Sequence, residues 1–294
     1  MDQLQKNILK TLIYYDLFDY PLTIEEIQKY LFQTEHGGQE EIKKALAKIE
    51  TIEEKDDYCF LAGRQEIVAI RQGRAKNAKE KWQILDKHLP KIIHIPFLRG
   101  LLASGSLALN NTDKDSDLDI FVIAAKNKIW TCRFFLMLKL KQLNILRHGQ
   151  DTKNKICPNH FITEDHLTLG PRNIYTARLY SHLVPLLGSS IFFQVQRNNL
   201  WISHLIPAYP FGISNNDPIM ERKQTASEKL LGYNIGWLLE KIFKFIQLTK
   251  IWSNPTHNSP YVIVSDKELA FHPKPQEPKI LRQYQEQLEK YGLS

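Results

Sequence analysis

Residues 105–122 read GSLALNNTDKDSDLDIFV, in which a Gly-Ser pair precedes two aspartates embedded in an apolar run. The run predicts a β-strand. Because side chains alternate faces along a strand, Asp117 and Asp119 should project to one side, while Leu118 and Ile120 project into a core. Two carboxylates held this close raise each other's proton affinity unless a cation lies between them. Hard oxygen ligands favour Mg²⁺, which takes phosphate oxygens for its remaining positions. The strand therefore predicts part of a magnesium site.

The Gly-Ser pair ends the segment before this acidic strand. Residues 97–104 have the composition of a strand, and Gly105-Ser106 would turn it into a short helical run at 107–109. Glycine lets the backbone approach a phosphate closely, and the serine hydroxyl together with free N–H groups at a helix start can hold an anion. The sequence thus predicts a phosphate-binding turn beside the two aspartates.

The Gly-Ser pair, the spacer and the acid–apolar–acid strand together resemble the signature of the DNA polymerase β nucleotidyltransferase superfamily. The resemblance covers residues 105–122. It implies an α/β (α+β) core with a mixed sheet, in which Gly105 and Ser106 bind the triphosphate of an NTP. Asp117 and Asp119 would bind one or two Mg²⁺ ions. The implied reaction moves a nucleoside monophosphate from the NTP to a hydroxyl acceptor and releases pyrophosphate.

A third carboxylate, from a neighbouring strand, usually completes the site in this superfamily. Residues 155–163 predict that strand, yet it contains no acid. The alternatives stay open: Asn159 occupies the position, Glu164 or Asp165 reaches back from the strand end, or Asp115 contributes from the near side. An asparagine carbonyl can ligate Mg²⁺ but cannot accept a proton, so Asn159 in this place would leave the chemistry without its base.

A long helix is predicted at 129–146, directly after the acidic strand. Its apolar residues predict a face that packs in the core and consists of Trp130, Phe134, Met137, Leu138 and residues 140–143. Arg133 lies one turn into this helix, from where it could contact a phosphate of the nucleotide. An arginine in such a position is more often a surface residue.

Residues 1–62 predict a separate unit of three helices and a hairpin. Thr23 and Glu26 form a capping box for the second helix, a third helix is expected near 40–50, and Asp56-Asp57 should form the turn between two short strands. The pattern resembles a winged helix-turn-helix, which implies contact with nucleic acid or with a protein. Acidic residues on the third helix and on the wing would repel phosphate, and this favours the protein contact.

The remainder of the chain divides into a connector, a catalytic unit and a C-terminal region. The predicted limits are 63–95 for a basic helical connector, 96–170 for the nucleotidyltransferase unit and 171–294 for a helical region. Helices are expected in the last region at 174–187, 190–204 and 221–252, followed by a charged helix at about 278–291. Appended helices position the base or the acceptor in relatives of the superfamily, so this region is expected to set specificity.

The composition indicates which cellular compartment and which partners to expect. The chain has 294 residues, 43% hydrophobic, and a formal net charge of +7, which favours polyanionic partners such as nucleotides. Its three cysteines, at positions 59, 132 and 157, lack zinc spacing and suit reduced thiols of an intracellular protein. The N-terminus has no apolar signal core and charges interrupt the apolar stretch 230–252, so a cytoplasmic protein without a membrane segment is expected.

Two functions follow from these patterns. The first is a Mg²⁺-dependent nucleotidyltransferase that uses an NTP and a hydroxyl acceptor on a small molecule, a protein or an RNA. The alternative is a catalytically inactive relative that acts as a regulator or adaptor and binds DNA or a protein partner through residues 1–62. The sequence leaves the acceptor open, because function depends on the particular site and not on the fold.

Overall fold

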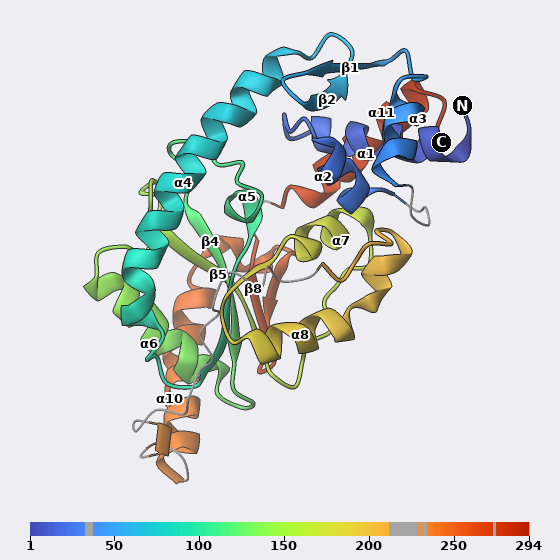
Figure 1. Ribbon diagram of the computed structural model, residues 1–294. Coiled ribbons are helices and arrows are strands. Elements are labelled where there is room, and N and C mark those ends of the chain that lie inside the picture. The colour runs from blue at the N-terminus through green and yellow to red at the C-terminus, as the bar shows by residue number, and fades with distance from the viewer. Residues whose placement is uncertain (33–37, 212–227, 230, 232–233, 273–274, 294) are drawn as a thin grey trace.

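The computed structural model describes residues 1–32, 38–211, 228, 229, 231, 234–272 and 275–293. It is a mixed α/β structure with a six-stranded sheet of strand order β6-β3-β4-β5-β8-β7 (Figure 1). The strands are β3 (Leu98–Ala103), β4 (Leu118–Ala124), β5 (Ile156–Thr163), β6 (Val184–Leu187), β7 (Val262–Val264) and β8 (Glu268–Phe271). Among the strands that the structure describes, only β4 and β5 pair in parallel, and α6 (Ile129–Gln142) provides the crossover between them. The mixed sheet agrees with the predicted fold class.

Each face of the sheet is covered by helices, which decides where the two aspartates point. Leu118, Ile120 and Val122 are fully buried and share a core with residues of α4 (Glu66–Ile92) and α6. Phe121 and Ile123 share a core with residues of α7 (Ile174–Ser181) and α8 (Ser189–Asn198) on the other face. The alternation predicted for the acidic strand is confirmed.

The N-terminal unit contains α1 (Gln3–Asp16), α2 (Ile24–Tyr30), α3 (Gln39–Leu46) and the antiparallel strands β1 (Ile52–Lys55) and β2 (Tyr58–Leu61). Thr23 and Glu26 form the predicted capping box. Asp56 and Asp57 have φ values of 52° and 65°, which a two-residue turn of the primed type requires. The predicted three helices and hairpin are therefore confirmed as elements.

The far end of the chain completes this N-terminal unit. Helix α11 (Glu277–Lys290) buries Ile280, Tyr284 and Leu288 in the same core as α1 and packs against that helix (Figure 1). These residues recur every four positions, so they form one apolar stripe that needs a partner. The N-terminal core thus includes the C-terminal helix as well as residues before the boundary predicted at residue 62.

The C-terminal region is not all helical, which corrects the prediction for 171–294. Strands β6, β7 and β8 come from this region and complete the sheet, so the core is not confined to 96–170. The helix predicted at 174–187 ends at Ser181, and Pro185 lies instead in the edge strand β6, where a missing N–H is tolerated.

Other helices follow the predictions with shifted ends. The connector is α4, and the short helix after the Gly-Ser turn is α5 (Gly105–Ala108). The region after α8 continues with η1 (Leu200–His204), α10 (Asn234–Trp252) and η2 (Pro255–Asn258), while the predicted segment 221–227 lies outside the described residues. Helix α10 packs against α6. Among the described helices, none combines the length and the apolar character needed to cross a membrane.

Candidate active site

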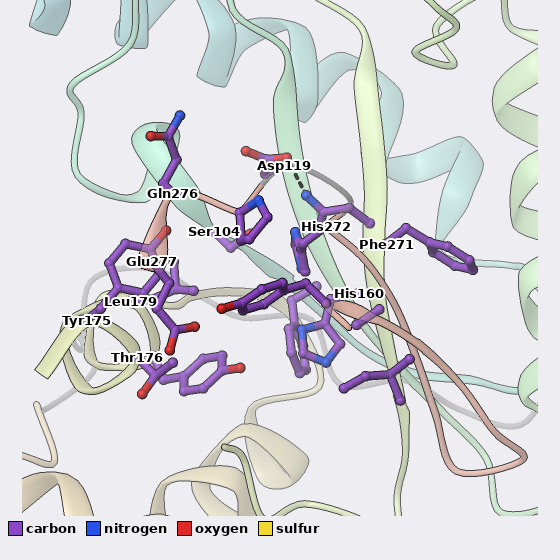
Figure 2. Close-up of a pocket in the computed structure, with 18 of the residues that line it drawn as sticks. Ser104, Asp119, His160, Tyr175, Thr176, Leu179, Phe271, His272, Gln276 and Glu277 are labelled. Atoms are coloured by element: carbon purple, nitrogen blue, oxygen red, sulfur yellow. Dashed lines mark hydrogen bonds between the residues drawn. The ribbon is translucent and has the colours of Figure 1, made fainter. Parts of the chain in front are cut away.

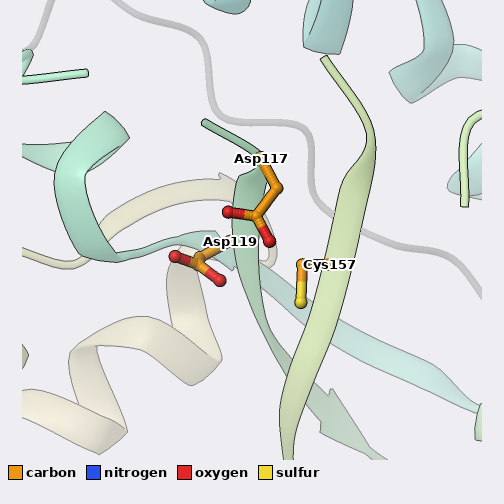
Figure 3. Close-up of side chains that lie close together, drawn as sticks. All are labelled: Asp117, Asp119 and Cys157. Carbon is orange, nitrogen blue, oxygen red and sulfur yellow. The ribbon is translucent and has the colours of Figure 1, made fainter. Parts of the chain in front are cut away.

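The two aspartates lie side by side at the start of β4. Asp119 is the second residue of β4, and Asp117 is the residue immediately before the strand begins. Because the two are two positions apart, both point to the α7 face of the sheet. Cys157 lies opposite Asp119 on the neighbouring strand β5. Side-chain ligand atoms of Asp117, Asp119 and Cys157 all lie within 4.8 Å of one another (Figure 3). The structure therefore places the predicted carboxylate pair in one cluster.

Gly105 lies directly against Asp119. Its backbone has a φ of +61°, and a Cβ atom at this position would lie 2.6 Å from Oδ2 of Asp119. Only glycine adopts this conformation without strain and leaves room for the carboxylate. Ser104 and Gly105 line the cavity beside Asp119, whereas Ser106 is not among the described residues that line it, and its carbonyl oxygen accepts a hydrogen bond from the amide of Asn111. The turn thus brings Ser104 and Gly105 to the cavity.

The side chains of β5 that lie beside Asp119 are neutral: Cys157 and Asn159. The pairing of β4 with β5 shifts register after Ile120, and Asn159 lies in this irregularity. Nδ2 of Asn159 donates a hydrogen bond of 2.6 Å to Oδ1 of Asp119. Of the open alternatives, Asn159 is the one that the structure brings to the carboxylate pair.

Arg147 supplies the counter-charge of this cluster and was not found from the sequence. Its Nε atom lies 3.0 Å from Oδ2 of Asp117, and its Nη1 donates to Sγ of Cys157 over 3.7 Å. Arg147 stands in the irregular segment before β5, next to Leu146, which forms a bridge with the start of that strand. No local pattern reveals this contact, because it depends on how the segment returns to the sheet.

The electrostatics of the cluster favour a hard cation. Burial and the neighbouring Asp117 raise the pKa of Asp119 to about 7, although Arg147 opposes the shift. Burial, followed by Asp119 and Asp117, raises the pKa of the Cys157 thiol to about 12, so the sulfur stays protonated and is a poor metal ligand. The effective donors are therefore the oxygens of the two carboxylates, because Asn159 turns its amide nitrogen toward Asp119. This donor set fits Mg²⁺ better than a soft metal.

Lys81 fixes the loop that leads into Asp117. This residue of α4 is only 1% exposed, and its Nζ donates to the carbonyl of Lys114, the carbonyl of Ser116 and the side chain of Asn154. Burial lowers its pKa. In the sequence analysis it belongs to the basic connector at 63–95 and is not singled out. Its spacing from Ala78 and Leu85, both fully buried, is the signal that places it on the inner face.

The other predicted acids do not reach the site. The amide of Glu164 donates to the carbonyl of Ala124 at the far end of β4, and its carboxylate accepts from the amide of Lys126. Asp165 pairs with Lys126 at the same end. Because β4 and β5 run parallel, this end lies about 20 Å from Asp117 along the strands. The prediction that Glu164 or Asp165 reaches back to the metal site is therefore corrected.

Asp115 and Arg133 also lie apart from the pair. Asp115 has a side chain that is 80% exposed and pairs with Lys153 at 3.4 Å. Arg133 stacks over Phe271 and donates to Oε1 of Gln247 on α10, on the other face of the sheet. It lines a different cavity from the one that contains Asp119, so the prediction that Arg133 binds the phosphates of a nucleotide held there is corrected.

The cavity beside Asp119 has a volume of about 600 Å³ and aromatic walls (Figure 2). Tyr175 and Tyr180 of α7 form one side, and Gln276 and Glu277 at the start of α11 close it toward the N-terminal unit. This size matches sites for small ligands and cofactors. No motif in the sequence marks Tyr175, which the structure places on the cavity wall.

A network of ionisable groups forms the opposite wall. Oε1 of Glu268 on β8 lies 3.0 Å from Nε2 of His160, and its Oε2 lies 3.4 Å from Nε2 of His166. Burial would raise the pKa of Glu268, but the hydrogen bonds from these histidines outweigh it and the pKa is lowered. Burial, with a contribution from His160, lowers the pKa of His272 to about 4. None of these groups was singled out by sequence as part of the site.

Comparisons of the chain with protein-family models, with curated proteins and with solved structures found no match.

Proposed function

We propose that this protein is a Mg²⁺-dependent nucleotidyltransferase of the DNA polymerase β type. It would move a nucleoside monophosphate from an NTP to a hydroxyl acceptor: a bond forms between the acceptor oxygen and the α-phosphorus, and pyrophosphate leaves. The observation that carries the proposal is the contact between Gly105 and Asp119. It sets a glycine turn, which can approach phosphate, against Asp119, which lines a cavity of about 600 Å³ and has Asp117 beside it.

Different residues of this chain would bind the NTP donor and the cation. Asp117 and Asp119 would hold Mg²⁺, which when bound neutralises phosphate charge and polarises the reacting phosphorus. The backbone at Ser104 and Gly105 would face the triphosphate, because both residues line the cavity. Tyr175 offers an aromatic side chain to the base on the same cavity wall.

A second candidate function is favoured by the neutral residues beside Asp119. Asn159 and the protonated Cys157 occupy the strand positions from which a third carboxylate would act, and neither can serve as a base. A protein with this site could bind a nucleotide and regulate a partner without transferring it. The two functions share the nucleotide site and differ only in turnover.

The N-terminal unit is the surface through which the regulator would act. Its three helices and hairpin fit a winged helix, but Lys43 of α3 is paired with Glu40, and Glu53 and Glu54 on the wing are exposed. These acids would repel a phosphate backbone. A protein partner therefore fits this unit better than DNA does.

The test is a calorimetric titration of each NTP, with and without Mg²⁺, into the wild type, Asp117→Asn and Asp115→Asn. Asp115 is the matched control, because it lies two residues away and its side chain is 80% exposed. We expect Mg²⁺-dependent binding of at least one NTP, lost in Asp117→Asn and retained in Asp115→Asn. Equal binding by all three proteins, or no binding of any NTP, would remove the nucleotide site from this cluster.

Turnover distinguishes the two functions once binding is shown. Pyrophosphate release from the bound NTP, measured with hydroxyl-bearing small molecules, RNA and protein extracts as acceptors, would support the transferase. A Glu or Asp in place of Asn159 supplies the missing carboxylate. If the wild type binds NTP without turnover and Asn159→Asp gains it, the protein is the inactive relative.

A further inference from the structure

A second cavity lies on the opposite face of the β7–β8 hairpin. It has a volume of about 540 Å³ and is bordered by α6, α10, η2 and the hairpin. In the hairpin, Val262 pairs with Phe271 and both line this second cavity, whereas the adjacent pair, Ile263 and Ala270, lines the cavity of Asp119. We call the two spaces the acidic cavity and the basic cavity.

The basic cavity gathers positive charge. Its charged lining residues are Arg133, Lys141, Arg147 and Lys250, of which Arg147 is paired with Asp117, and none of the described residues that line the cavity is Asp or Glu. Lys141 and Lys250 are exposed and project from α6 and α10 respectively. Like charges brought this close repel one another, which an anionic ligand would relieve.

Arg133 shows that one of these charges is built into the site. Its guanidinium lies over the ring of Phe271 at 4.7 Å, and Nη1 donates to Oε1 of Gln247 at 2.6 Å. Its buried Nε atom has no hydrogen-bond partner among the described residues. Burial lowers the pKa of Arg133 to about 10, yet the group remains charged at neutral pH. A charge held in this way, without a carboxylate, is costly unless an anion joins it.

Most of the other residues that line the basic cavity are apolar, and Gln247, Asn254, Thr256 and His257 are the polar ones. Phe134, Met137 and Leu138 of α6 face Ile246 and Ile251 of α10 across it. Leu138 is 41% exposed and Ile246 is 48% exposed, so the rim offers apolar surface to a ligand. A ligand that fills this space needs an anionic head and an apolar body, and the volume suits a small molecule.

We propose that the basic cavity binds a small phosphate monoester with an aromatic or aliphatic body. A phosphate dianion can accept hydrogen bonds from several cations at once, including the geometrically fixed guanidinium of Arg133. The apolar body would lie between α6 and α10.

The position of the cavity suggests what this ligand is for. Arg147 and Phe271 line both cavities, and Arg147 also pairs with Asp117. A phosphate monoester that also carries a hydroxyl would therefore be held next to the carboxylate pair and could be the acceptor. This assignment as the acceptor rests on the proposed nucleotidyltransferase function, whereas the binding itself does not.

The experiment is a calorimetric titration of phenyl phosphate into the full-length protein in the absence of Mg²⁺ and NTP. We expect binding that weakens as salt is raised, that is weaker for inorganic phosphate, and that is absent for phenol. Lys141→Gln and Lys250→Gln should each weaken it at least fivefold. Lys139→Gln is the matched control, since Lys139 lies on the same helix as Lys141 but outside the cavity lining.

A further variant tests the apolar half of the ligand site. Leu138→Ala should weaken phenyl phosphate several-fold and leave inorganic phosphate unchanged. Thermal melting of each variant checks folding, which these exposed positions should not disturb. Phenyl phosphate binding that is undetectable at millimolar concentration, or that is equal in wild type, Lys141→Gln and Lys250→Gln, would overturn the proposal.

Asp117→Asn separates this proposal from the proposed function. It should retain phenyl phosphate binding while it loses Mg²⁺-dependent NTP binding. If the wild type binds phenyl phosphate through Lys141 and Lys250 but binds no NTP, the anion site is supported and the proposed nucleotidyltransferase function is contradicted. If NTP binding depends on Asp117 and phenyl phosphate does not bind, the nucleotide site is supported and the anion site is contradicted.

Discussion

The acidic and the basic cavities lie on two faces of one hairpin, yet they hold opposite charge in different ways. In the acidic cavity, Asp117 and Asp119 repel each other and are partly neutralised by Arg147. In the basic cavity, Arg133 has no carboxylate partner among the described residues and rests on aromatic rings and an amide. Arg147 belongs to both. The comparison teaches that a single guanidinium separates a site suited to a cation from a site suited to an anion.

The largest expected effect comes from Gly105→Ala, which breaks only the acidic cavity. The new Cβ would lie 2.6 Å from Oδ2 of Asp119 and would displace the carboxylate. We expect Mg²⁺-dependent NTP binding to fall by about 100-fold, the scale of a small misplacement of reacting groups. Gly63→Ala is the control, because Gly63 also has a positive φ, +80°, but faces open space. Equal loss of NTP binding in both variants would show that backbone strain, and not the clash, is responsible.

Arg147→Gln should change the ligand affinities of the two cavities in opposite directions. Loss of the cation weakens phenyl phosphate binding by about tenfold, the scale of one charge-assisted hydrogen bond. The same loss removes a competitor for Asp117, so binding of Mn²⁺, used as a paramagnetic substitute for Mg²⁺, should tighten about threefold. Calorimetry and electron paramagnetic resonance measure the two affinities. Changes of the same sign at both sites would contradict the shared role of Arg147.

Asp119→Asn should stabilise the metal-free protein at pH 8. The folded-state pKa of Asp119 is raised to about 7 from an ordinary value of 3.8, so the folded state holds the proton more tightly than the unfolded state. Stability is therefore lost as pH rises from about 4 through 7, and an asparagine removes this loss. We expect Tm to rise by about 2–4 °C, which corresponds to about 1 kcal/mol in a protein of this size. Asp115→Asn should leave Tm unchanged, and a fall in Tm for Asp119→Asn would contradict the pKa.

The smallest effect is expected from His272→Gln, on the wall of the acidic cavity. The folded-state pKa of His272 is lowered to about 4 from 6.5, so the unfolded state binds the proton more readily. Stability is thus present above pH 6.5 and is lost as pH falls toward 4. Between pH 7 and pH 5, the free energy of unfolding of the variant should fall by about 1 kcal/mol less than that of the wild type, as measured by urea unfolding. His148→Gln, at an exposed position, should follow the wild type.

Much of the acidic site could be predicted because its information is local. Alternation along residues 118–122 places Asp119 opposite the core face, and a glycine before a short helix signals a turn. Short-range patterns also gave the capping box of α2 and the turn at Asp56-Asp57. These features depend on neighbours within a few residues, so they can be predicted from the sequence without knowledge of the tertiary structure.

The parts that could not be predicted depend on long-range packing. Arg147, Lys81 and Glu268 reach the site or its cavity from segments that no local pattern connects with Asp119. Leu138 was assigned to the core, but the helix is apolar on several sides, and only the fold shows that this residue borders the basic cavity. Apolar composition alone does not tell which face a neighbouring element will cover.

The sequence by itself determined the acidic strand, the glycine turn and the order of most helices, because hydrophobic periodicity and backbone sterics act over a few residues. Only the tertiary structure decided that β6, β7 and β8 complete the sheet and that α11 completes the N-terminal core. It also decided that Asn159, and not Glu164, lies beside Asp119. These outcomes depend on strand pairing and on the burial of distant apolar stripes against each other, which are set by the free energy of the whole chain.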